Sequence, residues 1–146
     1  MRHINEIIIH CTATRKSWMQ ANLTRDKVAE ITRWHVEDNR WSDIGYHFVI
    51  DTDGTVAAGR PVTRPGAHCR GKNRRSIGVT LVGGFGGSQD DEFTDHYTDE
   101  QDEALTLLIE SLKETYPTIT KVSGHNQYAN KGCPCFDVQE YTGAVS

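Results

Sequence analysis

The sequence contains no hydrophobic run of the length that a transmembrane helix needs, which is about 18–20 residues. It also lacks an excess of positive charge, since 16 Lys and Arg residues against 20 Asp and Glu residues give a formal net charge of −4. A general nucleic-acid binder needs clustered cations to neutralise phosphates, so none is expected here. Asn5 and Glu6 interrupt the apolar residues near the N-terminus, and no small-residue cleavage site follows them. We therefore expect no signal peptide and no membrane partner.

Cysteine is scarce, with four residues among 146, and this number allows two disulfides or none. A chain that stays in the cytoplasm keeps its thiols reduced, and reduced thiols are available as metal ligands. The length indicates one domain over residues 1–146, and a hydrophobic content of 36% is sufficient for a core.

Apolar runs and helical periodicity alternate along the chain. Two helices are expected, one from a Thr24 cap to about residue 38 and one from a Thr98 capping box to about residue 116. Residues 51–54 (Asp-Thr-Asp-Gly) are typical of a hairpin turn and do not match a calcium loop. Strands are expected at residues 4–10, 46–50, 55–58, 77–82 and 119–122. This alternation predicts an α/β fold in which helices cover a sheet.

Three potential metal ligands follow or end predicted strands: His10, His125 and Cys133. Two neutral imidazoles and one thiolate suit Zn²⁺, and three protein ligands leave a fourth position for water, as in catalytic sites. The chain contains seven histidines, however, so a chance pair is easy to find, and the spacing alone favours scattered surface and packing histidines.

Five motifs in order resemble the zinc-dependent N-acetylmuramoyl-L-alanine amidases of type 2. Residues 8–14 (Ile-Ile-His-Cys-Thr-Ala-Thr) resemble the first-ligand motif of that family, and residues 41–50 (Trp-Ser-Asp-Ile-Gly-Tyr-His-Phe-Val-Ile) resemble its second motif. The likeness continues through residues 53–60, 66–79 and 124–134, and it is greatest to the small amidase endolysins of phages. It extends from about residue 7 to residue 137, which is almost the whole chain.

The resemblance implies a central mixed sheet flanked by helices, with zinc in a surface groove. It implies hydrolysis of the amide that joins the lactyl group of N-acetylmuramate to L-alanine in peptidoglycan. Carried over residue by residue, it implies three zinc ligands, two catalytic residues and two substrate contacts. These are, in the same order, His10, His125 and Cys133, then Tyr46 and Lys131, then His68 and Asn73.

Physical chemistry supports the two catalytic roles, although each has a simpler alternative. An ammonium at Lys131 would lie near the metal and could stabilise an oxyanion, but a loop lysine can also be merely solvated. The Tyr46 hydroxyl could hydrogen-bond the carbonyl or the attacking water, but Tyr46 could instead be a core aromatic. The residues do not show which of the two moves the proton.

The remaining cysteines receive separate predictions. The family places its ligand directly before proline, which selects Cys133 over Cys135. Cys135 is then a small buried residue or a spare thiol. Cys11 should point away from the metal into the core, because it alternates with His10 on a strand. Cys69 is expected to be partly exposed.

Two charged stretches of the chain lead to different expectations. The stretch from Arg60 to Arg75 is basic, and we expect it to form a groove wall that attracts the carboxylates of peptidoglycan stem peptides. The acidic stretch over residues 90–103 is expected to be solvated surface.

The predicted function is that of a phage endolysin, which stays in the host cytoplasm as a monomer until it is released to the wall. A cytoplasmic amidase that recycles wall fragments is an alternative with the same chemistry. A peptidoglycan-binding protein without catalysis is a second alternative, which Cys133 disfavours. Inhibition of the phage RNA polymerase is a third alternative, and no motif in this chain supports it.

Overall fold

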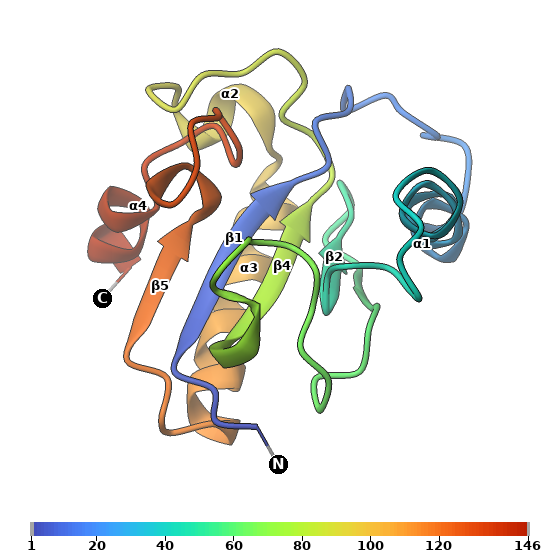
Figure 1. The fold of residues 1–146 in the computed structure, drawn as a ribbon. Helices are drawn as coiled ribbons and strands as arrows, with labels where there is room; N and C mark the ends of the chain where they lie inside the picture. The colour runs from blue at the N-terminus through green and yellow to red at the C-terminus, as the bar shows by residue number, and fades with distance from the viewer. Residues whose placement is uncertain (1, 146) are drawn as a thin grey trace.

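The computed structural model describes residues 2–145 and contains one five-stranded sheet with the strand order β3-β2-β4-β1-β5 (Figure 1). Strand β1 is parallel to both β4 and β5, β2 is parallel to β4, and only β3 runs antiparallel to its neighbour β2. The strands are β1 (Glu6–Cys11), β2 (Phe48–Ile50), β3 (Val56–Ala58), β4 (Ser76–Leu81) and β5 (Lys121–Gly124). The sheet is mixed, as predicted.

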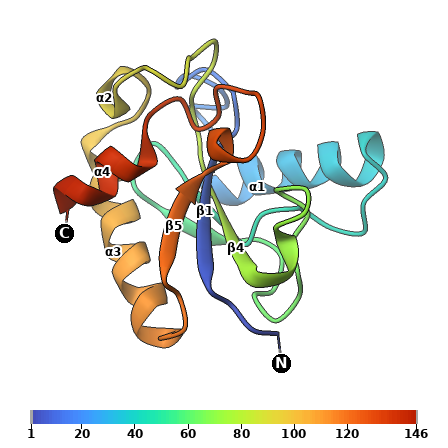
Figure 2. The same ribbon diagram turned by 60° about the vertical axis from the view of Figure 1, so that its left-hand side comes forward.

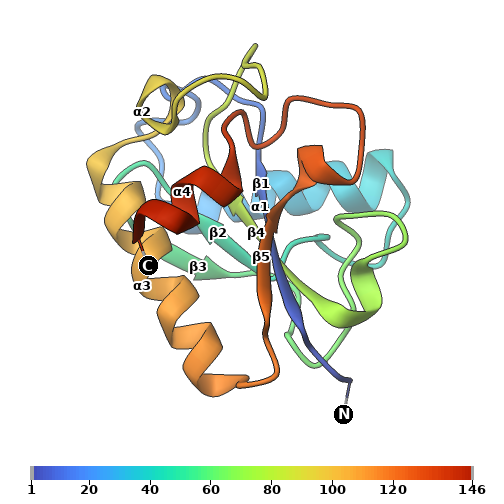
Figure 3. The same ribbon diagram turned by 90° about the vertical axis from the view of Figure 1, so that its left-hand side faces the viewer.

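Helices lie on both sides of this sheet. Helices α3 and α4 pack on one side, and α1 lies toward the other (Figures 2 and 3). The helices are α1 (Thr24–Arg33), α2 (Phe93–His96), α3 (Asp99–Thr115) and α4 (Val138–Val145). A π-helical segment, η1 (Trp34–Asp38), continues α1, and two short 3₁₀ helices are η2 (Asn73–Arg75) and η3 (His125–Gln127). Among residues 2–145, no helix combines the length and apolar character needed to cross a membrane.

Strand β1 is buried on both faces, but its two faces have different chemistry. Ile7, Ile9 and Cys11 belong to the main hydrophobic core, together with Leu105 and Ile109 of α3. The alternate residues of β1 and β4 point to the opposite face, because side chains alternate along a strand. On that face the register pairs Glu6 with Ser76, Ile8 with Gly78 and His10 with Thr80. The second face is therefore the polar one, and it carries the candidate site.

Helix α3 forms where the capping box predicts it. Thr98 accepts a hydrogen bond from the Gln101 N–H at 3.1 Å, and the Gln101 side chain accepts one from the Thr98 N–H at 3.0 Å. The Gln101 amide also donates to the carbonyls of Ile50 and Val82, and thereby joins the start of α3 to the ends of β2 and β4. A local capping signal and a tertiary contact thus reinforce one another.

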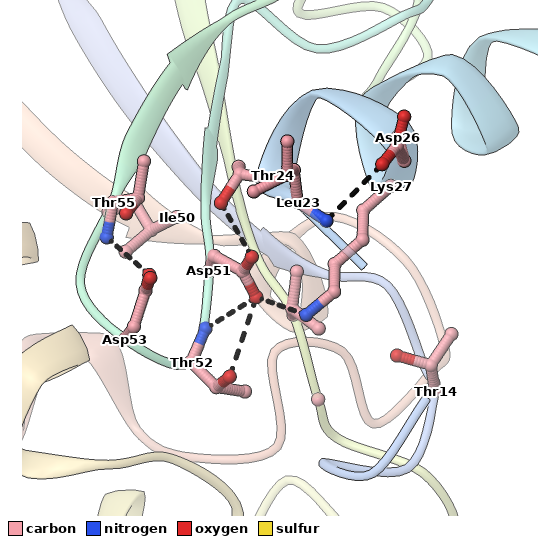
Figure 4. Close-up of polar contacts among 12 residues, drawn as sticks. Thr14, Leu23, Thr24, Asp26, Lys27, Ile50, Asp51, Thr52, Asp53 and Thr55 are labelled. Carbon is pink, nitrogen blue, oxygen red and sulfur yellow. Dashed lines mark hydrogen bonds and ion pairs between the residues drawn. The ribbon is translucent and has the colours of Figure 1, made fainter. Parts of the chain in front are cut away.

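The start of α1 differs from its prediction. Leu23 occupies the cap position and Thr24 is the first helical residue, so Thr24 is not the cap. Its hydroxyl donates instead to Asp51 Oδ2 at 2.7 Å, and Lys27 Nζ lies 2.7 Å from Asp51 Oδ1. Figure 4 shows both side chains reaching from α1 to this carboxylate at the end of β2. A buried ion pair therefore joins α1 to the hairpin turn.

Strand boundaries shift by up to two residues from their predicted positions, and the end of the first α-helix shifts further. The helix predicted to end near residue 38 is α-helical only to Arg33 and then becomes π-helical. The strand predicted to start at residue 46 starts at Phe48. The short helices α2, η2 and η3 were not predicted, because four- and three-residue helices carry little periodicity. The eight-residue C-terminal α4 was not predicted either.

Candidate active site

Three side chains with metal-binding atoms converge where β1 and β5 end. His10 is the penultimate residue of β1, His125 directly follows β5, and Cys133 lies in the segment before α4. The carboxyl ends of these parallel strands and the segment over residues 125–137 share one edge of the sheet (Figure 1). One ligand atom from each of the three side chains lies within 4.8 Å of the others. His10 Nδ1 and His125 Nδ1 are 3.0 Å apart.

The chemistry of this donor set fits a metal ion. The Cys11 thiol and burial raise the pKa of Cys133 in the metal-free site. The Cys11 backbone N–H acts in the opposite direction, because it donates to Cys133 Sγ at 3.1 Å and stabilises the thiolate that a metal requires. Burial is the main reason why the pKa of His10 lies well below its usual value. The charges of His68, His125 and Lys131 lower it further. Burial and the Lys131 charge lower the pKa of His125 as well. Both imidazoles are therefore neutral at pH 7, as metal ligation demands.

Tyr46 lies beside the three donors, just before β2. Its ring is half-buried, and its centroid is 5.3 Å from that of His10 and 5.4 Å from that of His35. Burial raises the pKa of the Tyr46 hydroxyl, and the neighbouring Cys133 and Cys11 sulfurs raise it further. The phenol is therefore neutral at pH 7 and able to donate a hydrogen bond.

Lys131 is exposed and lies at a cavity of about 470 Å³ that is also lined by His125, one of the three donors. Its charge acts on both His10 and His125, which places the ammonium in the electrostatic environment of the site. The cavity is lined by Trp41, Ala67, His68, Cys69, Arg70, Asn73, His125, Tyr128, Ala129 and Lys131. A groove of this size beside the donors can hold part of an extended substrate.

His68 and Asn73 both line this cavity, but the two ring nitrogens of His68 and the side-chain oxygen of Asn73 already have partners. His68 Nδ1 lies 2.8 Å from His10 Nε2, and His68 Nε2 lies 3.2 Å from Ser76 Oγ. Asn73 Oδ1 accepts hydrogen bonds from the N–H groups of His68 and Cys69, at 2.9 and 3.0 Å. Their contact with substrate stays a prediction, and the observed contacts indicate that they organise the site.

Two expectations about nearby residues are wrong. Cys69 is 3% exposed, not partly exposed, because it is folded into the turn that Asn73 closes. Arg60 is 8% exposed and donates to the backbone oxygens of Asp43, Ile44 and Pro65, so it is not part of a groove wall.

Other expectations about nearby residues agree with the structure. Cys11 belongs to the core, and Cys135 is 2% exposed, so the latter is the small buried residue of the two alternatives. His47 is buried, and its Nδ1 accepts a hydrogen bond from the Gly78 N–H at 3.0 Å.

Trp41 and Tyr128 were not predicted as site residues. Trp41 is 36% exposed and packs on His35, with ring centroids 4.7 Å apart. The Tyr128 hydroxyl donates to Glu6 at 2.5 Å, and Lys72 Nζ lies 4.6 Å from the Tyr128 ring centroid. Trp41 opens the second motif and could have been suspected on that ground, whereas nothing in the sequence marks Tyr128.

Comparison with known proteins decides the family. Residues 1–136 match the family model described as N-acetylmuramoyl-L-alanine amidase. The chain belongs to this amidase family. The endolysin of Enterobacteria phage K11 is 39% identical over 137 residues, which cover 94% of this chain and 84% of that protein. The endolysin of Escherichia phage T7 is 38% identical over 135 residues, covering 92% and 83%.

Solved structures agree with this assignment. The N-acetylmuramoyl-L-alanine amidase LysC from Clostridium intestinale superimposes with a TM-score of 0.75 at 30% identity, covering 99% of this amidase and 86% of that chain. The predicted enzyme class and the predicted α/β fold are thus confirmed. Amidases of this family depend on a metal ion, and the three converging donors of this amidase could hold one.

Proposed function

We propose that this amidase hydrolyses the amide between the lactyl group of N-acetylmuramate and L-alanine in peptidoglycan, with zinc held by His10, His125 and Cys133. The convergence of these three donors within 4.8 Å, beside the 470 Å³ cavity, is the observation that carries the proposal. A donor set of two imidazoles and one thiolate matches the preference of Zn²⁺. When bound, zinc supplies a Lewis acid that makes water nucleophilic at neutral pH.

The side chains around the donors supply the other requirements of amide hydrolysis. The neutral Tyr46 hydroxyl, beside the His10 ring, is placed to donate a hydrogen bond to the scissile carbonyl oxygen. The exposed Lys131 ammonium stabilises the negative charge that develops on that oxygen. Either group carries a proton that could pass to the leaving nitrogen.

The cavity gives a place for the stem peptide next to the scissile bond. Arg70 and Lys131 are exposed cations on its wall, and stem peptides carry carboxylates. Trp41 offers a half-exposed aromatic surface on the same wall. The substrate would therefore be held by charge at its peptide end and by apolar contact elsewhere.

The similarity to phage endolysins supports a role in host lysis. We place residues 1–146 in that role as one catalytic domain and as a monomer, which stays in the host cytoplasm until the inner membrane is opened. Size-exclusion chromatography with light scattering tests the monomer, because a dimer would elute with twice the 16.4 kDa mass.

The substrate and the metal can be tested together. Incubation with purified peptidoglycan is expected to release stem peptides with free L-alanine amino groups, and a chelator that removes zinc is expected to stop the release. Mass spectrometry of the soluble products identifies the bond that is cut. New reducing sugar ends in place of free peptides would contradict the amidase reaction, and full activity after metal removal would contradict the zinc mechanism.

Lys131→Met should lower kcat for peptide release by roughly 100- to 1,000-fold, because loss of an oxyanion donor costs about that much. The residue is exposed, so thermal stability should be unchanged. Zinc content, measured on the purified variant, should also be unchanged because Lys131 is not a ligand. Lys131→Arg keeps the charge and is the matched control. Equal activity of the Met variant and the wild type would leave Lys131 as a solvated loop residue.

A further inference from the structure

A row of buried hydrogen-bonded groups leads from His10 away from the metal donors. His10 Nε2 lies 2.8 Å from His68 Nδ1, and His68 Nε2 lies 3.2 Å from Ser76 Oγ. The Ser76 hydroxyl donates in turn to the backbone carbonyl of Lys72 at 2.8 Å. The three side chains are 1%, 7% and 0% exposed, in the same order, so little water competes for these contacts.

The carbonyl group at the end of this row determines which atom donates in each of its hydrogen bonds. A carbonyl oxygen can only accept, so the Ser76 hydroxyl donates its single proton to the Lys72 carbonyl oxygen. Ser76 Oγ must then accept from His68 Nε2–H. A neutral imidazole has one N–H, so His68 Nδ1 carries a lone pair and accepts from His10 Nε2–H. His10 Nδ1 is consequently left with a lone pair, and this is the atom that faces His125 Nδ1 at 3.0 Å.

We propose that His68 and Ser76 are positioning residues that fix His10 as its Nε2–H tautomer and so present Nδ1 to the metal. Metal-bound histidines usually donate their other N–H to a carboxylate, a carbonyl or water. Here a second histidine takes that place and relays the contact through a serine to a backbone carbonyl. The consequence for metal binding rests on the proposed function, whereas the tautomer is a property of the metal-free protein.

The close packing around His68 holds its imidazole ring in one position. A Cβ atom at Gly78 would lie 2.5 Å from the His68 ring, and one at Gly66 would lie 2.7 Å from its Cδ2 atom. Two glycines therefore make room for the imidazole between the loop and β4. The loop itself is held by Asn73, whose side-chain oxygen accepts the backbone N–H of His68. His68 and Asn73 thus act together on His10, with Asn73 placing the residue that orients the ligand.

The tautomer can be measured without any variant. Long-range ¹H–¹⁵N correlation spectra of the metal-free protein at pH 7.5 are expected to show His10 and His68 both protonated at Nε2. Spectra of the zinc-loaded protein should show the same protonation for both rings. A metal-free His10 protonated at Nδ1 would overturn the proposal, because the row of donors would then run in the other direction.

Variants test whether the row matters for the metal. Ser76→Ala and His68→Ala should each weaken zinc binding by about 10- to 100-fold in a competition titration against a chelator, the usual cost of losing such a partner. His68→Asn is the conservative control, because its amide oxygen can take the place of Nδ1 as acceptor. It should recover most of the affinity that His68→Ala loses. Thermal unfolding of each variant shows whether it is folded.

The outcomes separate this proposal from the proposed function. Folded Ser76→Ala protein with wild-type zinc affinity and an unchanged His10 tautomer would overturn the positioning role. Wild-type protein that binds no zinc at all would contradict the proposed function, while the spectra of the metal-free protein would still decide the tautomer.

Discussion

Replacing Cys133 by alanine is expected to abolish stoichiometric zinc binding and to lower the rate of stem-peptide release by at least about 1,000-fold. The thiolate is one of three converging donors, and two imidazoles alone hold zinc weakly. Loss of the Lewis acid removes several kcal/mol of transition-state stabilisation, and about 4 kcal/mol corresponds to roughly 1,000-fold in rate. Metal analysis of the purified protein and the peptide-release assay measure the two effects.

Cys135→Ala is the matched control for this experiment. Cys135 lies two residues further on and is buried, and its thiol donates to the Gly84 carbonyl at 3.4 Å, outside the donor set. The variant should keep its zinc and most of its activity. The opposite result, with zinc lost in Cys135→Ala and kept in Cys133→Ala, would exchange the roles of the two thiols.

The three converging donors could be predicted because the motifs that resemble the amidase family are local in sequence. Ile7, Ile8 and Ile9 are the apolar part of a buried strand, so the histidine that follows them lies near the carboxyl end of that strand. The order of the motifs then joined His10 to His125 and Cys133, and the structure brings the three together. The same locality explains α3, since Thr98 and Gln101 are close in sequence and make the cap that their residue types suggest.

The parts that could not be predicted depend on contacts between distant segments. Arginine is rarely buried, yet Arg60 is buried because three backbone oxygens from two loops converge on it. The row from His10 through His68 to Ser76 joins β1, a loop and β4, and its residues are neighbours only after folding. Thr24 has the side chain of a helix cap, but the distant Asp51 carboxylate takes its hydroxyl.

The buried Asp51 carboxylate gives the second prediction with a large expected effect. Lys27→Met is expected to lower the free energy of unfolding by about 3–5 kcal/mol at pH 7, because it leaves a buried Asp51 carboxylate without its cation. Both side chains are almost fully buried, at 3% and 4% exposed. Burial on its own would raise the pKa of Asp51, but hydrogen bonds from Lys27, Thr24 and the Thr52 N–H together lower it. Urea unfolding followed by circular dichroism measures the loss.

The matched control is the double variant Lys27→Met/Asp51→Asn, which removes both charges. Its amide oxygen can still accept from the Thr52 N–H, and its amide N–H can donate to the Thr24 hydroxyl oxygen. It should recover most of the lost stability, since a neutral pair has no desolvated charge. The pH dependence gives a second check. A lowered pKa means that the wild-type contribution is present above the unfolded value of 3.8 and is lost as pH falls through the folded pKa. The deficit of Lys27→Met should therefore shrink in acid, where Asp51 is protonated. A deficit below about 1 kcal/mol at pH 7 would show that Thr24 and Thr52 alone satisfy the carboxylate.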